Sequence, residues 1–172
     1  MGSFILEHLP QYKEIEPLLT GMDYVDIKTI KGKTNLSAFI AGMLSYYPWW
    51  ISFLLQVREI LVKILGLVKH EKPYDIPSYK SADIPFSPGG KVSFFTVVKA
   101  KDNKYWFAET PEDNHLSAYF GVIVEELDNH LKLFYIITTI KHKHWTGPVY
   151  FNLIRPFHHL VVQKMAQAGI MA

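Results

Sequence analysis

Hydrophobic and polar residues alternate with a helical period in the C-terminal segment, residues 147–168. At 100° per residue, one face of this helix carries Tyr150, Phe151, Ile154, Phe157, His158, Val161, Val162 and Met165. The opposite face carries Asn152, His159, Gln163, Lys164 and Gln167. Pro156 lies within the pattern and predicts a kink, because proline removes a hydrogen-bond donor and crowds the carbonyl four residues earlier. The segment predicts a long amphipathic helix that lies against a sheet.

A second helical pattern covers residues 48–66. Its broad apolar stripe is opposed by Ser52, Gln56, Glu59 and Lys63. A membrane-spanning helix needs about 20 predominantly apolar residues with few charges, whereas polar residues recur here at every turn. The pattern therefore predicts a helix that packs in the core, and no membrane span. A shorter helix over residues 36–44 is predicted after the N-cap candidates Thr34 and Asn35.

Five runs of alternating or β-branched and aromatic residues predict strands. They cover residues 23–31, 92–100, 104–109, 115–126 and 130–142. The last four are joined by short polar connections, which favour antiparallel hairpins. The proline-rich segment before them, residues 70–90, predicts a long surface connection near the mouth of a cavity. The fold class is therefore α+β, with helices gathered on one side of a curved antiparallel sheet.

Composition narrows the function classes. The 172 residues predict a single domain, residues 1–172. A net charge of +2 with scattered basic residues argues against a nucleic-acid partner. The aromatic share of 15% fits either a packed interior or an aromatic-lined cavity. The chain has no cysteine and no signal-peptide pattern at its start, which favours a cytoplasmic location.

The order of elements resembles the helix-grip fold of the START-like, or SRPBCC, superfamily. The resemblance rests on PWWISFLLQVREILVKILGL at residues 48–67, on the run of strands, and on HWTGPVYFNLIRPFHHLVVQKM at residues 144–165. Within that superfamily, the chain looks like a domain family of unknown function. The resemblance implies a curved sheet that wraps the C-terminal helix around a cavity, and it supplies no catalytic motif. Some members are attached to a nucleotide-binding oxidoreductase domain, which implies a separate oxidoreductase as a partner.

No cofactor or metal is expected. Gly89 and Gly90 form an isolated pair in a proline-rich segment, and no Gly-rich strand–turn–helix fingerprint for a nicotinamide cofactor exists. Four histidines suggest a metal site at first sight: His142, His144, His158 and His159. No carboxylate falls at a recognisable spacing from them, so we expect no metal site.

His158 is the strongest candidate for chemistry. It lies on the apolar face of the C-terminal helix, whereas its neighbour His159 is predicted to point away from the sheet. A buried imidazole is either a hydrogen-bonded structural group or an acid/base in a cavity. The same choice between structural and ligand-binding roles applies to the other candidates, which are Arg58, Trp106, Tyr119, Tyr150 and Arg155.

Three functions fit these residues. The first is binding of a small apolar or amphipathic molecule between the sheet and the C-terminal helix, with His158 and Arg155 orienting it. The second is a cyclase, dehydratase or isomerase in which His158 is the acid/base and a tyrosine or arginine polarises a carbonyl. The third is an interaction module that forms a homodimer through a sheet edge, with its own aromatics filling the cavity.

Overall fold

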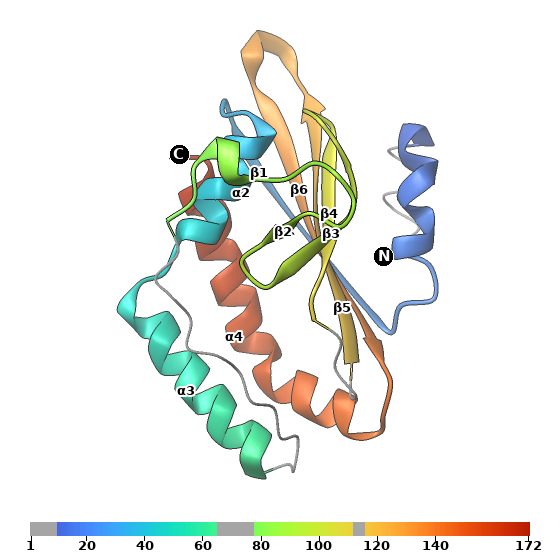
Figure 1. Ribbon diagram of the computed structural model, residues 1–172, viewed down its shortest axis with the longest axis vertical. Coiled ribbons are helices and arrows are strands. Elements are labelled where there is room, and N and C mark those ends of the chain that lie inside the picture. The colour runs from blue at the N-terminus through green and yellow to red at the C-terminus, as the bar shows by residue number, and fades with distance from the viewer. Residues whose placement is uncertain (1–9, 65–77, 112–115) are drawn as a thin grey trace.

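The computed structural model describes residues 10–64, 78–111 and 116–172 (Figure 1). Its strands are β1 (Tyr24–Gly32), β2 (Lys91–Val92), β3 (Phe95–Lys101), β4 (Tyr105–Glu109), β5 (Leu116–Glu126) and β6 (Lys132–His142). The α-helices are α2 (Leu36–Ser45), α3 (Trp49–Ile64) and α4 (Thr146–Gly169). Three short 3₁₀ helices are η1 (Pro10–Leu18), η2 (Ser81–Asp83) and η3 (Asp128–His130).

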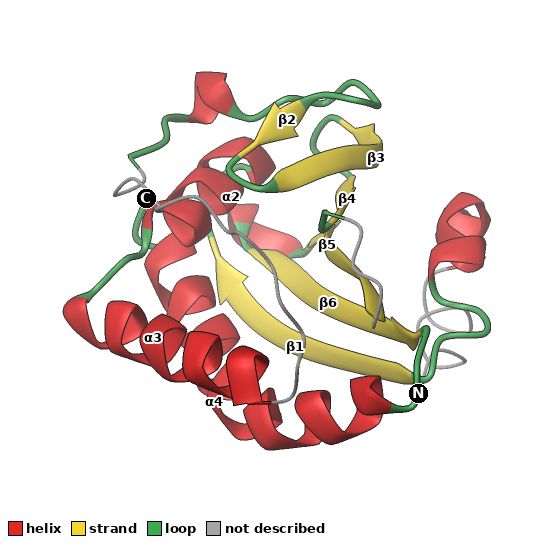
Figure 2. Cartoon of the chain, turned by 60° about the horizontal axis from the view of Figure 1, so that its bottom comes forward, coloured by secondary structure: helices red, strands yellow, loops and turns green. Residues whose placement is uncertain are grey.

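The strands form one antiparallel sheet with the order β1-β6-β5-β4-β3-β2. Its one non-sequential pairing joins the first strand to the last, with Tyr24 opposite Ile140 and Gly32 opposite Lys132. The sheet curves around α4 (Figures 1 and 2), while α2 and α3 lie on the same side as α4. The predicted α+β fold class and helix-grip architecture are confirmed.

Two local predictions need correction. The run over residues 92–100 is a hairpin of β2 and β3 rather than one strand, because Ser93 adopts a positive φ of 55° and reverses the chain. Residues 81–83 of the segment predicted as a surface connection form the short helix η2. Residues 65–66 of the second predicted helix, and residues 70–77 of the predicted connection, lie outside the described residues.

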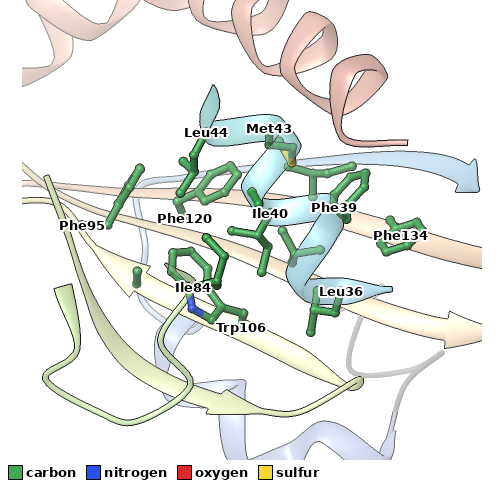
Figure 3. Close-up of a cluster of buried hydrophobic side chains, with 14 of the residues drawn as sticks. Leu36, Phe39, Ile40, Met43, Leu44, Ile84, Phe95, Trp106, Phe120 and Phe134 are labelled. Carbon is green, nitrogen blue, oxygen red and sulfur yellow. The ribbon is translucent and has the colours of Figure 1, made fainter. Parts of the chain in front are cut away.

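The helix-facing side of the sheet is filled mainly by side chains of α2 (Figure 3). Phe39 stacks on Phe134 of β6 with 4.1 Å between ring centroids. The same cluster includes Trp106 of β4 and, from α4, Val162 and Ala166. Burial of this apolar surface is the main favourable term holding the helices on the sheet. The side chains of this cluster fill the space between the sheet and the C-terminal half of α4.

The other side of the sheet is covered as well. Ile15 and Leu19, in and just after η1, pack against Tyr105, Phe107, Ile123, Tyr135 and Ile137. Figure 1 shows η1 across the sheet from the α-helices. The prediction that helices gather on one side therefore holds for α2, α3 and α4, but not for η1.

Helices α2 and α4 meet through glycines. A Cβ added at Gly169 would lie 2.7 Å from the carbonyl oxygen of Phe39, and one added at Gly42 would lie 2.6 Å from Cβ of Ala172. Only glycine allows this approach, so the C-terminal half of α4 is held tightly to α2. The N-terminal half runs beside α3 instead (Figures 1 and 2). The helix continues through Pro156 and changes direction along its length, as the predicted kink requires.

Replacing Gly169 with alanine tests this close approach. We expect Gly169→Ala to lower the free energy of unfolding by about 1–3 kcal/mol, because the added methyl overpacks the contact despite the higher helix propensity of alanine. Urea denaturation followed by circular dichroism measures the change. The exposed substitution Gln163→Ala on the same helix is the control and should stay within about 0.5 kcal/mol of wild type. A Gly169→Ala variant as stable as wild type would contradict the proposed contact.

Candidate functional site

A polar cluster joins the edge strand β1 to α4. Tyr24, Asp26 and Lys28 alternate along β1 and therefore project from one face of the strand. His159 of α4 lies among them, with Nε2 3.1 Å from the Tyr24 hydroxyl. Its Nδ1 lies 3.0 Å from Nζ of Lys28 and 3.3 Å from Oδ2 of Asp26. Lys28 and Asp26 also form an ion pair at 3.3 Å. We call these four residues the β1–α4 polar cluster.

The prediction that His159 points away from the sheet is therefore wrong. A helical wheel treats the sheet as a flat surface on one side of the helix. The sheet here curves around α4, so its edge strand reaches a side chain at the margin of the helix face. The β1–α4 polar cluster stabilises this edge of the fold, since each partly buried charge has an opposite charge or a hydrogen bond close by.

His158 faces the sheet, as predicted. Its Nε2 lies 3.4 Å from Oγ1 of Thr138 on β6, and its ring meets Phe151 edge-on. Burial lowers the pKa of His158 from 6.5 to about 4, with a further lowering from His159. Asp26 raises that pKa and Lys28 lowers it, both by less. The imidazole is therefore neutral and weakly basic at pH 7, whereas a general acid/base works best with a pKa near the working pH.

Tyr24 also remains neutral. Burial raises its pKa above 10, the nearby Asp26 raises it further, and the charge of Arg155 lowers it slightly. This influence places Arg155, which is exposed on α4, in the electrostatic neighbourhood of the β1–α4 polar cluster.

Arg58 and Tyr150, two of the predicted ligand-binding residues, lie together. Nε of Arg58 on α3 donates a hydrogen bond of 2.7 Å to the hydroxyl of Tyr150 on α4. Tyr150 is buried and Arg58 is half-buried. The pair fixes one point of contact between the two helices and holds a guanidinium there.

The remaining two candidates lie elsewhere. Trp106 is fully buried in the core, and its indole N–H donates to the carbonyl of Pro85 at 2.9 Å. Tyr119 neighbours Phe120, which belongs to the helix-facing cluster, and alternation therefore places Tyr119 on the side of the sheet that η1 covers. The structure thus brings Arg58 and Tyr150 together, but neither Trp106 nor Tyr119 joins them.

An apolar groove runs between α3 and α4. It measures about 490 Å³, and among the described residues its walls are all apolar or aromatic: Trp49, Trp50, Phe53 and Leu54 of α3 with Phe157 and Leu160 of α4. Figure 2 shows the two helices side by side. Arg58 follows Leu54 by one helical turn, and Tyr150 precedes Phe157 by two turns. The groove therefore leads along both helices toward the Arg58–Tyr150 pair.

One feature of the sequence indicates this groove, a second apolar stripe on α4. Val149, Leu153, Phe157 and Leu160 form a second apolar stripe on α4, turned away from the sheet, and each is about half exposed. Phe157 was predicted to be on the sheet-facing side, which is wrong: the position lies well round the helix from His158 and Val162. A helix with apolar residues on two sides indicates a second contact surface.

The described residues form neither a metal-binding cluster nor a single membrane-spanning helix. Among the residues described, no group of three or more histidine, aspartate or glutamate side chains is placed to hold a metal ion. Over the same ranges, no single helix combines the length and apolar character needed to cross a bilayer. Residues 36–45 and 49–60 meet that criterion only as a pair, and they are bent by 68° relative to each other.

Residues 18–165 match the model of a family described as "Protein of unknown function (DUF2867)". The chain belongs to the DUF2867 family. The predicted resemblance to a domain family of unknown function is thereby confirmed. A search of the curated proteins found no match to this DUF2867 protein.

Several solved structures are distantly similar to this DUF2867 protein. The crystal structure of Ara h 8.0201 has a TM-score of 0.44 and 6% identity, covering 87% of this chain and 99% of the other. Norcoclaurine synthase from Thalictrum flavum has a TM-score of 0.41 and 12% identity, covering 86% and 84%. A START superfamily protein from Mycobacterium smegmatis has a TM-score of 0.40 and 13% identity, covering 84% and 94%. No ligand or activity follows for this chain from similarities this distant.

The low pKa of His158 predicts a specific pH dependence of stability. The unfolded histidine takes up a proton as the pH falls through 6.5, whereas the folded one stays neutral down to about pH 4. Protonation therefore favours the unfolded state, and stability falls as the pH drops from 7 to 4. This single group accounts for about 3 kcal/mol of that loss.

We expect His158→Gln to show a shallower loss of stability between pH 7 and pH 4 than wild type, in urea denaturation at several pH values. The carboxylates contribute equally to both proteins and cancel in the comparison. His130→Asn, at an exposed histidine, serves as the control and should keep the wild-type slope. Identical slopes for His158→Gln and wild type would show that His158 titrates normally in the folded protein.

Proposed function

We propose that this protein binds a small amphipathic molecule, with the apolar part in the α3–α4 groove and the polar part at Arg58 and Tyr150. One observation carries the proposal: a groove whose described walls are all apolar or aromatic leads along α3 toward the half-buried guanidinium of Arg58. Ligand sites commonly measure about 300–1,000 Å³ and combine an apolar lining with a few placed polar groups. The groove matches that description in volume and in chemistry.

The apolar lining supports affinity for a hydrocarbon chain. Trp49 is 81% exposed and Phe53 58% exposed, so water covers aromatic surface that a ligand can cover instead. Each buried methylene contributes about 0.8 kcal/mol, against several kcal/mol for lost translational and rotational freedom. An aliphatic chain of roughly ten carbons is therefore long enough to bind measurably.

The polar end favours a carboxylate. Arg58 presents planar donors that match the two oxygens of a carboxylate, and the hydroxyl of Tyr150 holds the guanidinium in place. An ordered arginine loses less conformational entropy when it binds than a mobile surface side chain does. We therefore expect an acid rather than an amine at this end of the groove.

This proposal changes the predicted position of the ligand. The sequence suggested a site between the sheet and the C-terminal helix, oriented by His158 and Arg155. In the structure His158 faces the sheet, and Arg155 is near β1, on the other side of α4 from the groove. Arg58 and Tyr150 are better placed for that role. The cytoplasmic location and the separate oxidoreductase partner stay predictions from the sequence.

Acid/base catalysis by His158 receives no support from its geometry. The imidazole is buried against Thr138 and Phe151, and its pKa of about 4 makes it a weak base. We therefore propose binding alone for the groove.

Decanoate is a suitable probe for the apolar part. Trp49 and Trp50 line the groove, so titration with decanoate should change the intrinsic tryptophan fluorescence. We expect Phe157→Ser to weaken binding by about tenfold or more, since it removes an apolar wall. Phe94→Ser is the matched control, because Phe94 is 43% exposed where Phe157 is 47% exposed but lies in the β2–β3 turn. Equal affinities for the two variants would contradict binding in the groove.

A comparison of decanoate with decanol tests the polar end. Arg58→Gln should weaken decanoate binding by about tenfold or more, because a charge-assisted hydrogen bond contributes about 1.5–3 kcal/mol. Decanol, which has no charge, should bind the variant about as well as it binds wild type. The same fluorescence titration measures both. Equal losses for the acid and the alcohol would mean that Arg58 supports the helices but does not recognise the ligand.

A further inference from the structure

Helices α3 and α4 together expose a large apolar surface. On α4, Val149, Leu153, Phe157 and Leu160 are each about half exposed on the side away from the sheet. On α3, Trp49, Phe53 and Ile60 are more than half exposed. We call these seven residues the outer α3–α4 face. The two helices lie side by side in both views of the fold (Figures 1 and 2). Trp49, Phe53, Phe157 and Leu160 line one groove. Ile60 lies two turns after Phe53, and Val149 and Leu153 lie two turns and one turn before Phe157, so all seven residues belong to one surface.

The exposed apolar area of this face is large enough for a protein partner. Aromatic side chains offer about 150–250 Å² each, and seven large side chains at these exposures present roughly 700 Å² of apolar surface. The largest apolar patch on a typical monomer is about 300–600 Å². A stable protein–protein interface buries about 800 Å² on each partner. The face is therefore too large for an ordinary solvated surface and close to the size of one half of a dimer interface.

We infer that the outer α3–α4 face is a homodimer interface, in which a second copy of this chain packs the same face across a two-fold axis. Such an interface must be self-complementary, because each copy offers the same patch. This face can meet that condition, because Trp49 is 81% exposed and the other six side chains are about half exposed. Apolar side chains of one copy then meet apolar side chains of the other. Two helices from each copy then form a four-helix layer.

The charges near the face favour a protein partner over a lipid surface. Helices that lie on membranes carry many lysines and arginines on the flanking polar face. The described parts of α3 and α4 carry four such residues, Arg58, Lys63, Arg155 and Lys164. Arg58 is hydrogen-bonded to Tyr150, Lys63 pairs with Glu59 at 3.0 Å, and Arg155 lies near β1. The basic residues of the described parts of the two helices are therefore few and scattered, which favours a second copy over anionic lipid.

Dimerisation would also change the exposure of the ligand groove to solvent. The groove is open on the side of the outer face, and a second copy packed there would enclose it. Ile60, Val149 and Leu153 belong to the face but do not line the groove. The dimer therefore does not depend on the ligand, and the two proposals can be tested separately.

Sedimentation velocity of the full chain tests the dimer. At micromolar concentration the 19.9 kDa chain should sediment as a dimer with twice that mass. We expect Leu153→Glu and Ile60→Glu to shift this equilibrium toward monomer by at least tenfold, because each places a charge inside the interface. Phe94→Glu is the control, since Phe94 is about as exposed as Leu153 but lies in the β2–β3 turn. Circular dichroism checks that all variants are folded.

Three results would overturn the inference. One is a wild-type chain that stays monomeric at 100 μM. Another is a dimer that survives both Leu153→Glu and Ile60→Glu, which would place the interface elsewhere. The third is a monomer that co-sediments with vesicles of phosphatidylcholine and phosphatidylserine and loses this binding in Leu153→Glu, which would assign the face to membranes. A wild-type dimer that does not bind decanoate would instead overturn the proposed ligand alone.

Discussion

The apolar residues of α4 occupy two sides of the helix, and a single sheet can cover only one of them. Val162 and Ala166 pack into the core on one side, while Leu153 and Leu160 are about half exposed on the other. A helix of this composition normally has a contact on each face. The placement of α3, the apolar groove and the outer α3–α4 face all follow from this requirement.

The fold divides α4 into two parts with different neighbours. At the C-terminal end, Gly42 and Gly169 let the backbones of α2 and α4 approach closely, and α2 fills the space over the sheet. At the N-terminal end, α3 lies beside α4 and the Arg58–Tyr150 hydrogen bond links them. Tight packing therefore holds one end, whereas the other end leaves a groove. The β1–α4 polar cluster and the neutral His158 hold the sheet-facing side of α4 between these two regions.

Much of the fold was predictable because its signals are local. The strands and helices follow from periods of two and 3.6 residues. Of the two predicted N-cap candidates, Asn35 caps α2, and its side chain accepts from the backbone N–H of Ala38 at 2.8 Å. The β2–β3 hairpin was not predictable from the sequence. Ser93 lies within a run of residues that favour strands, and nothing in its sequence context indicates its positive φ. The contact of His159 with β1 depends on the curvature of the sheet, which the wheel of a single helix does not contain.

The candidate site was predictable only in its parts. Arg58 and Tyr150 were each predicted as candidate ligand-binding residues, but they are 92 positions apart and their hydrogen bond depends on how α3 packs against α4. The groove likewise needs both helices. Phe157 and Leu160 show that α4 has a second apolar side, yet the sequence does not indicate that Trp49 and Phe53 complete its walls.

Native mass spectrometry with added decanoate tests the central claim, ligand binding in the α3–α4 groove, most directly. A spectrum counts bound molecules per chain without relying on any reporter side chain. The account predicts one decanoate for each chain at saturation, with much lower occupancy at the same concentration when serine replaces Phe157. A chain that carries no ligand at any concentration, or one whose occupancy is unaffected by that substitution, would contradict it.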